Sequence, residues 1–176
     1  MEHKTLGESD LDVSAVTMGL WNVAGGVTWG EAEREEAIAA IDAAIDAGIT
    51  TFDTAEAYGD GTSERILGEA IAGRDRRDIR IATKAWTDNH RAADLKAACR
   101  ASLERLGTEY VDLYYLHYPN EEVPFEETFG ALADLREEGL IREVGVSNFG
   151  VEQLREAREA SPVPIVANQV PYSLLW

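Results

Sequence analysis

Cysteine is almost absent from this sequence, which contains a single one, Cys99, among 176 residues. One cysteine cannot form a disulfide bond within the chain. Cys99 falls on the same helical stripe as Leu95, Ser102 and Leu106, a spacing that is typical of a helix face packed against a core. We therefore expect a buried and unreactive thiol at this position.

Long apolar runs and basic leader segments are missing as well. No stretch of about 18 consecutive apolar residues, the length that crosses a bilayer, occurs in the sequence. Residues 1–30 lack the basic start and apolar centre of a secretion signal. These absences predict neither a membrane span nor a signal peptide, so the expected location is the cytoplasm.

Basic residues are scarce relative to acidic ones. Lys and Arg together number 16 against 33 Asp and Glu, which gives a formal net charge of −17. The only lysines are Lys4, Lys84 and Lys96. A surface this acidic disfavours nucleic acid and anionic membranes as partners. The excess of acid is typical of a halophile with an acidic proteome, and an acidic mesophilic protein is the alternative.

The sequence does contain a repeated alternation of strand and helix patterns. Its length and its 45% hydrophobic share suit one domain spanning residues 1–176. A small β-hairpin is expected over residues 3–16. Strands are then predicted at 15–20, 49–53, 79–83, 111–116, 141–146 and 165–168, with helices at 31–47, 63–72, 88–106, 125–138 and 150–160.

This alternation predicts a parallel α/β fold with right-handed crossovers. Two closures are possible, an open doubly wound sheet and a TIM (β/α)8 barrel. Polar residues follow the ends of many successive strands, and a barrel gathers such residues on one rim, whereas an open sheet binds its ligand at one switch point. The prediction is therefore a barrel. It is incomplete, because complete barrels need roughly 250 residues, and about six of the eight βα units are present.

The candidate catalytic residues are Asp53, Tyr58, Lys84 and His117. A lone Lys84 on a buried strand is costly, and Asp53 at the end of the neighbouring strand would neutralise it. Because an ammonium close to a phenol favours the phenolate, we expect a lowered pKa for Tyr58 and a role as general acid. His117 adds a second donor that can orient a carbonyl oxygen.

Such a pocket offers proton donors without a nucleophile or a metal cluster, which suits the reduction of a carbonyl group. Hydride must then come from a nicotinamide or a flavin. Ser147, Asn148 and Gln169 could hydrogen-bond a carboxamide on the cofactor ring. Taken singly, these residues have ordinary explanations, for instance Asp53 as a helix cap and His117 as a satisfied core histidine. Their joint placement at successive strand ends favours the functional interpretation.

The sequence resembles the aldo-keto reductases along most of its length. The resemblance rests on the N-terminal hairpin, FDTAEAYG at 52–59, TK at 83–84, DLYYLH at 112–117, GVSNF at 145–149 and NQ at 168–169. It implies a (β/α)8 barrel without a Rossmann fold that uses NADP(H) to reduce a small-molecule aldehyde or ketone. It also implies that Tyr58 donates the proton, that Asp53 and Lys84 tune it, and that His117 orients the substrate carbonyl.

The resemblance further implies the contacts of cofactor and substrate. Ser147, Asn148 and Gln169 look like ligands of the nicotinamide carboxamide. Asp53 is expected to belong to the cofactor-binding residues as well. Trp21 and Trp86 look like walls of the substrate pocket. No metal is implied.

The family's seventh and eighth strands, with the loops that grip the pyrophosphate and the adenosine 2′-phosphate, have no counterpart in the sequence. We expect unpaired barrel edges to lead to oligomers or to a partly disordered monomer, and NADPH to bind far more weakly than to a full barrel. Two alternatives to a reductase stay open. One is an inactive or subunit-dependent fragment, and the other is a nucleotide-sensing accessory subunit built on the same barrel.

Overall fold

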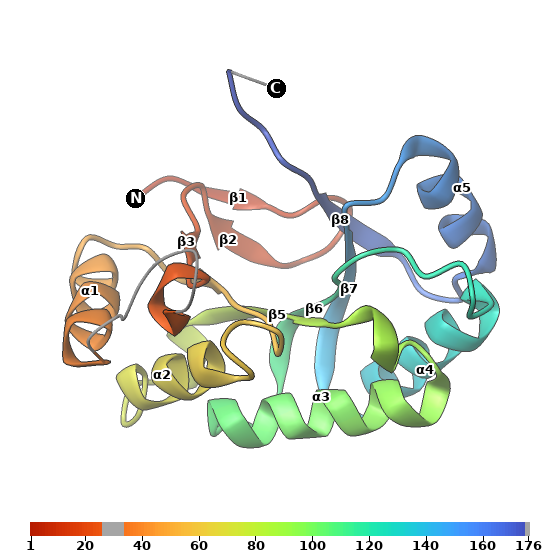
Figure 1. Ribbon diagram of the computed structural model, residues 1–176. Helices are drawn as coiled ribbons and strands as arrows, with labels where there is room; N and C mark the ends of the chain where they lie inside the picture. Colours follow the sequence, from red (N-terminus) through yellow and green to blue (C-terminus); the bar gives the residue numbers. More distant parts are fainter. Residues whose placement is uncertain (26–33, 175–176) are drawn as a thin grey trace.

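A computed structural model describes residues 1–25 and 34–174 of the chain. A short antiparallel hairpin, β1 (His3–Thr5) and β2 (Asp12–Ser14), comes first. Further strands then alternate with helices along the chain (Figure 1). The strands are β3 (Met18–Gly19), β4 (Thr51–Asp53), β5 (Arg80–Ala85), β6 (Val111–Leu116), β7 (Ile141–Ser147) and β8 (Ile165–Gln169). The helices are α1 (Arg34–Asp46), α2 (Thr62–Ala70), α3 (Ala92–Leu106), α4 (Phe125–Glu137) and α5 (Val151–Ala160), with 3-10 turns η1 (Asn22–Ala24), η2 (Arg76–Asp78) and η3 (Thr87–Asn89).

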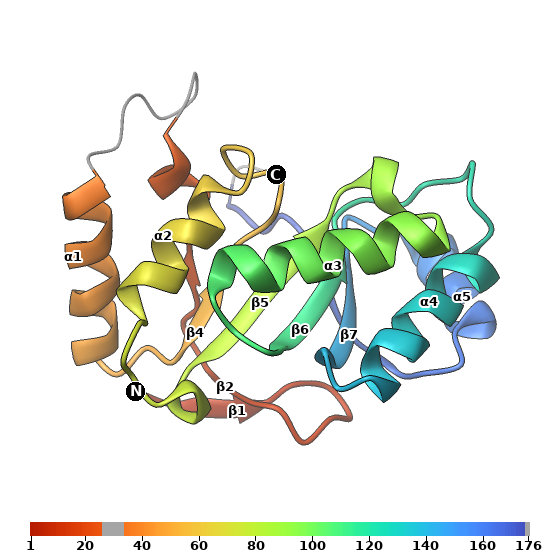
Figure 2. The ribbon, with the colours of Figure 1, turned by 90° about the horizontal axis from the view of Figure 1, so that it is seen from below.

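The strands from β3 to β8 form one sheet of six in the order of the sequence, each parallel to its neighbour. A parallel sheet in sequence order places every crossover on the same side, because the connections share one hand. The helices accordingly cover one face of the curled sheet (Figures 1 and 2). The fold is thus an incomplete (β/α)8-type barrel, as predicted from the sequence.

The helical side of the sheet holds the main hydrophobic core. Strand residues such as Phe52, Ile81 and Tyr114 pack there with helix residues such as Leu67. Burying an apolar side chain of this size contributes about 1.5–3 kcal/mol. Cys99 of α3 is fully buried in the same core, as expected, and burial raises the pKa of its thiol to about 12.

The inner side of the curled sheet holds a smaller core. Ala82 of β5 and Tyr115 of β6 pack there with Leu11 of the hairpin. Successive side chains of a strand point to opposite faces, so residues two positions further along point inward as well. This alternation directs Lys84 and His117 into the space above the small core, at the carboxyl ends of the strands.

The hairpin covers the amino ends of the strands (Figure 2). The backbone N–H of Ser14 donates to the hydroxyl of Thr51 at 2.9 Å, which ties β2 to the start of β4. Gly7, at the hairpin turn, lies so close to the carbonyl oxygen of Val166 that a Cβ atom would collide with it. The hairpin therefore closes the end of the barrel opposite to the candidate site.

The predicted elements are confirmed, with differences in their bounds. The strand predicted over 15–20 is only β3, because residues 15–17 form the connection from the hairpin to the sheet. β5 continues through Ala85, so Lys84 lies inside the strand rather than after it. The predicted start of helix 31–47 lies outside the described residues. Among the helices of the two described ranges, none is long and apolar enough to cross a membrane.

Candidate active site

Asp53 and Lys84 form a buried ion pair at the carboxyl ends of β4 and β5. The ammonium nitrogen of Lys84 lies 2.5 Å from Oδ1 of Asp53 and also donates to the carbonyl oxygen of Thr54 at 2.8 Å. Lys84 is fully buried, and burial lowers its pKa, while the Asp53 carboxylate opposes that shift. The two oxygen acceptors supply the compensation that a buried ammonium requires. The structure thus brings Asp53 and Lys84 into contact, as the sequence predicted.

Tyr58 stands beside this pair, in the loop between β4 and α2. Its hydroxyl oxygen accepts a hydrogen bond from Lys84 at 3.2 Å. The expectation of a lowered pKa for Tyr58 is wrong, because its pKa is raised well above the ordinary value. Burial is the largest cause, since a phenolate loses its hydration there, and the negative charge of Asp53 acts in the same direction. Tyr58 therefore keeps its proton at neutral pH, which is the state that a proton donor needs.

His117 follows β6 and lies next to Tyr58, with the two ring centres 5.6 Å apart in an edge-to-face arrangement. Burial, and after it the nearby Lys84 ammonium, lower the pKa of His117 to about 4. The imidazole is therefore neutral at pH 7, with one N–H group and one acceptor nitrogen. Its Nδ1 atom is buried without a hydrogen-bond partner within the described part of the chain. His117 thus has a ring nitrogen whose hydrogen-bonding capacity is not used by any residue that the structure describes.

The ends of β7 and β8 contribute Ser147, Asn148 and Gln169. Nδ2 of Asn148 donates to the carbonyl oxygen of His117 and to Oγ of Ser147, both at 3.0 Å. Nε2 of Gln169 donates to Oδ2 of Asp53 at 3.0 Å, which joins β8 to β4 across the inside of the sheet. Because both amides use their NH2 groups in these bonds, each keeps its carbonyl oxygen as an acceptor. Asn148 has φ of 62°, a left-handed conformation that asparagine adopts more readily than most residues.

A cavity of about 330 Å³ lies above these groups. Tyr58, His117, Ser147, Asn148 and Gln169 line it, together with Trp21 and Trp86. The ring of Trp21 stacks on Tyr58 at 6.2 Å, and that of Trp86 meets His117 edge-on at 5.1 Å. Every site residue predicted from the sequence thus belongs to this cavity or to the ion pair beside it. Their chemical roles stay predictions.

One lining residue, Tyr118, was missed by the sequence analysis. Its ring stacks on His117 at 5.2 Å and meets Trp86 edge-on at 5.7 Å. Strict strand alternation places Tyr118 on the face opposite to His117. β6 ends at Leu116, and the ladder of hydrogen bonds continues only to His117, whose backbone N–H donates to the carbonyl oxygen of Ala85, so the alternation no longer applies at Tyr118. An aromatic residue next to a candidate histidine, just past a strand end, was the available signal.

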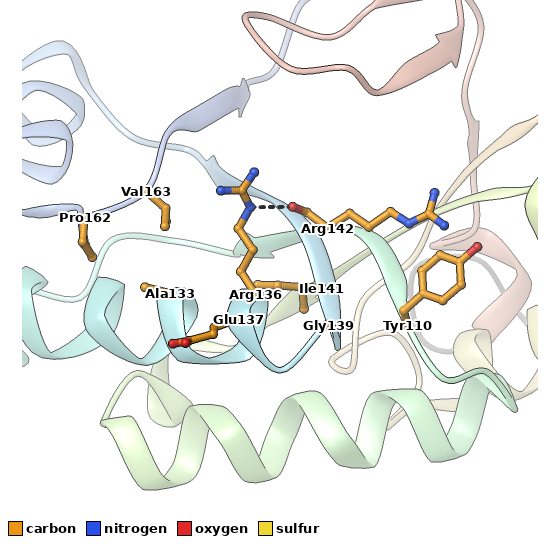
Figure 3. Close-up of a pocket in the computed structure, with 9 residues that line it drawn as sticks. All are labelled: Tyr110, Ala133, Arg136, Glu137, Gly139, Ile141, Arg142, Pro162 and Val163. Carbon is orange, nitrogen blue, oxygen red and sulfur yellow. Dashed lines mark hydrogen bonds between the residues drawn. The ribbon is translucent and has the colours of Figure 1, made fainter.

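A larger cavity, of about 750 Å³, lies near the amino end of β7 and contains none of the predicted site residues (Figure 3). Both of its arginines are engaged within the protein. Nε of Arg136 donates to the carbonyl oxygen of Arg142 at 2.8 Å. The guanidinium of Arg142 lies 4.1 Å from the centre of the Tyr110 ring and also contacts Asp112. The smaller cavity is therefore the better candidate for chemistry.

Comparison with known proteins gives a consistent result. Residues 15–176 match the model of the aldo/keto reductase family. The chain is 39% identical over 183 residues to the aldo-keto reductase YhdN of Bacillus subtilis (strain 168), covering 99% of this chain and 54% of that protein.

Solved structures show the same similarity. The thermostable aldo-keto reductase Tm1743, in complex with the inhibitor epalrestat, superposes with a TM-score of 0.93 and 42% identity over 98% of this chain and 63% of that chain. An aldo-keto reductase from Klebsiella pneumoniae in complex with NADP and acetate gives a TM-score of 0.82 and 35% identity, over 95% of this chain and 57% of that chain. The chain spans a little over half the length of these relatives.

Proposed function

The chain belongs to the aldo/keto reductase family, and from this premise we propose that it carries the catalytic site of an NADPH-dependent reductase of aldehydes or ketones. The observation that carries the proposal is the buried Lys84 ammonium, which contacts both Asp53 and the hydroxyl of Tyr58 next to the cavity. Carbonyl reduction needs a proton for oxygen as well as a hydride for carbon. The cavity offers the proton from Tyr58.

In the proposed mechanism, Tyr58 gives its proton to the substrate oxygen as negative charge develops there. An alkoxide is a stronger base than a phenolate, so a raised pKa of Tyr58 still allows the transfer. The Lys84 N–H that already points at the Tyr58 oxygen then stabilises the phenolate that remains. Asp53 keeps Lys84 charged and in place for this task.

His117 is assigned the role of orienting the carbonyl group. It is neutral at pH 7 and lines the cavity next to Tyr58, so its N–H can donate to the same oxygen. A donor aimed at an oxygen that gains charge contributes roughly 10²–10³-fold to the rate. The aromatic rings of Trp21, Trp86 and Tyr118 form apolar walls that limit access of water to the reacting groups.

The residues at the ends of β7 and β8 fit a nicotinamide. The hydrogen bonds of Asn148 and Gln169 leave two amide oxygens as acceptors, which match the NH2 group of a carboxamide. We assign Ser147, Asn148 and Gln169 to this contact, with Asp53 next to it. When bound, a reduced nicotinamide supplies the hydride that side chains cannot provide. The Klebsiella pneumoniae relative with bound NADP supports NADPH as the cofactor.

A coupled assay tests the proposal. The protein that carries these residues is mixed with NADPH and a series of aldehydes and ketones, and the loss of NADPH absorbance is followed, with NADH as the comparison. We expect oxidation of NADPH that requires a carbonyl compound, and slower oxidation of NADH. Absence of turnover with every carbonyl compound, together with no NADPH binding by fluorescence titration, would overturn the assignment.

A further inference from the structure

The loop that carries Tyr58, residues 54–61, is held by a buried serine outside the cavity. The hydroxyl of Ser63 accepts a hydrogen bond from the hydroxyl of Thr54 and donates to the carbonyl oxygen of Leu20, each at 2.8 Å. The backbone N–H of Ser63 donates to the carbonyl oxygen of Tyr58 at 3.2 Å. Ser63 therefore joins the two ends of the loop and ties both to the end of β3.

Glu64, the next residue, connects the same turn to the strand that carries Lys84. It is fully buried and lies on the helical side of the sheet, away from the cavity. Its carboxylate accepts a hydrogen bond from the hydroxyl of Thr83 at 2.6 Å and one from Nε of Arg105 at 2.5 Å. Thr83 directly precedes Lys84 in β5. The first turn of α2 is thus tied to β5 and α3 at once.

Arg105 also lies against the backbone of the Tyr58 loop. Gly61, the last residue of that loop, has φ of 76°. A Cβ atom at Gly61 would collide with Cδ and Nε of Arg105. A side chain at this position would displace the guanidinium from its place beside Glu64. Arg105 therefore fixes the end of the loop by direct contact and by its bond to Glu64.

Stability alone does not account for these polar groups. A buried ion pair is often no more stabilising than apolar side chains of the same volume. Ile66 and Leu67, which follow Glu64 closely in α2, belong to the main hydrophobic core. What the ion pair adds is a defined geometry. Hydrogen bonds are directional, so these bonds form only when the loop, β5 and α3 have one particular relative placement. The charge of Glu64 also favours the ammonium form of Lys84.

We propose that Ser63, Glu64 and Arg105 are positioning residues that hold the hydroxyl of Tyr58 next to Lys84 from behind the sheet. The proposal rests on the reductase function proposed above. None of the three lines the cavity, so each acts through the loop and through β5.

The test compares Glu64→Gln with a matched control, Asp112→Asn, in the protein that carries these residues. Asp112 is an equally buried carboxylate, 1% exposed and paired with two arginines, and it lies outside the cavity. For Glu64→Gln we expect kcat to fall roughly 10²-fold, because a small misplacement of a reacting group lowers the rate by a factor of this order. The KM for NADPH should not change. The alkaline limb of the kcat profile should move to lower pH, because Lys84 loses a negative neighbour. Asp112→Asn should lower the unfolding temperature and leave kcat and the pH profile unchanged.

A second readout does not depend on activity. The protein is labelled with 3-fluorotyrosine, and Tyr58→Phe identifies the fluorine resonance of Tyr58. Glu64→Gln should shift that resonance, and Asp112→Asn should not. A shift in a protein that reduces no carbonyl compound would support the positioning role and reject only the reductase. If Glu64→Gln changes neither the resonance nor kcat, the positioning role is overturned. Should Glu64→Gln fail to fold, the uncharged variant Ser63→Ala is measured in the same way, with the same expected shift and the same refuting result.

Discussion

Two buried aspartates on the same sheet, Asp53 on β4 and Asp112 on β6, show how one kind of ion pair serves two purposes. Asp112 accepts hydrogen bonds from Arg76 at 2.6 Å, from the backbone N–H of Ile81 at 3.0 Å and from Arg142 at 3.3 Å. These bonds join η2, β5, β6 and β7. Both guanidiniums also flank the ring of Tyr110, at 4.3 and 4.1 Å from its centre.

Asp53 is bonded differently. One of its oxygens accepts a hydrogen bond from Lys84 and the other accepts one from Gln169. Lys84 also donates a hydrogen bond to the hydroxyl of Tyr58. Tyr58 and Gln169 both line the cavity of the candidate site. The hydrogen bonds of Asp112 end instead at the backbone of Ile81 and at two guanidiniums, of which that of Arg142 lines the larger cavity. A buried charge pair is therefore structural when all its bonds return to the scaffold. It can serve chemistry when the last group in the chain of bonds can give up a proton into a cavity, as the hydroxyl of Tyr58 can and the guanidinium of Arg142 cannot.

The sharpest test of this contrast replaces one tyrosine in each cluster. Tyr58→Phe removes the proton donor and keeps the ring, so turnover on an aldehyde should fall roughly 10²–10⁴-fold while NADPH binding survives. Tyr110→Phe should change turnover little, because the hydroxyl of Tyr110 makes no hydrogen bond within the described residues. Steady-state kinetics and NADPH fluorescence titration measure both variants. Near-normal turnover of Tyr58→Phe would exclude this residue as the acid.

The next comparison removes one charge from each cluster. Lys84→Met leaves the Asp53 carboxylate buried without its counter-charge, which should destabilise the fold by about 3–5 kcal/mol and also reduce activity. Asp112→Asn keeps a polar group between partly exposed arginines and should cost less, about 1–3 kcal/mol, with kcat unchanged. Urea unfolding and kinetics provide the two measurements. An equal loss of kcat in both variants would contradict the division between them.

A third comparison uses pH, because the Asp53 cluster contains a titrating neighbour. The pKa of folded His117, about 4, lies below its ordinary value of 6.5. Between these two values the unfolded chain binds a proton that the folded chain does not, so stability falls as pH drops through this window and is unaffected above it. Thermal unfolding should show this fall, with part of it removed by His117→Gln.

A second histidine completes the pH experiment. Burial also lowers the pKa of His90 to about 4, so His90 should account for the rest of the fall. Parallel curves for wild type and His117→Gln would show that His117 does not titrate as described.

The smallest effect concerns salt. With a net charge of −17, the fold should gain stability as salt screens the repulsion between exposed acids. The unfolding temperature should rise from low to molar KCl by about 2–4 °C for each 1 kcal/mol of repulsion removed. The deficits of Lys84→Met and Asp112→Asn relative to wild type should stay nearly constant, because both replaced side chains are buried. A flat or falling series for the wild type would contradict the halophile interpretation.

The sequence predicted most of the fold and the position of the site. The order of elements depends on local patterns, and strands such as β6 coincide with the predicted range. The contact of Asp53 with Lys84 could be predicted because the carboxyl ends of neighbouring parallel strands meet on one rim.

Quantities that depend on the surroundings of a side chain could not be predicted. The pKa of Tyr58 was expected to move the other way, because the sequence shows the nearby ammonium but not the loss of water around the phenol. Nothing in the sequence indicates that the carboxylates of Glu64 and Asp112 are ion-paired. Only the packing of α2, α3 and the strands shows that both are buried and paired.

The hairpin that closes the amino end of the barrel has a consequence for the way the chain is made on the ribosome. Residues 3–14 are synthesised before every strand of the sheet, yet the carbonyl that contacts Gly7 belongs to Val166 of β8. Contacts between residues so distant in sequence form late and slow the folding of a domain. During synthesis the hairpin can therefore contact β4 but cannot complete its packing until β8 has been made. Until then the inner core with Tyr115 stays open to water, so a segment synthesised before the sheet completes its packing only after the last strand of the sheet.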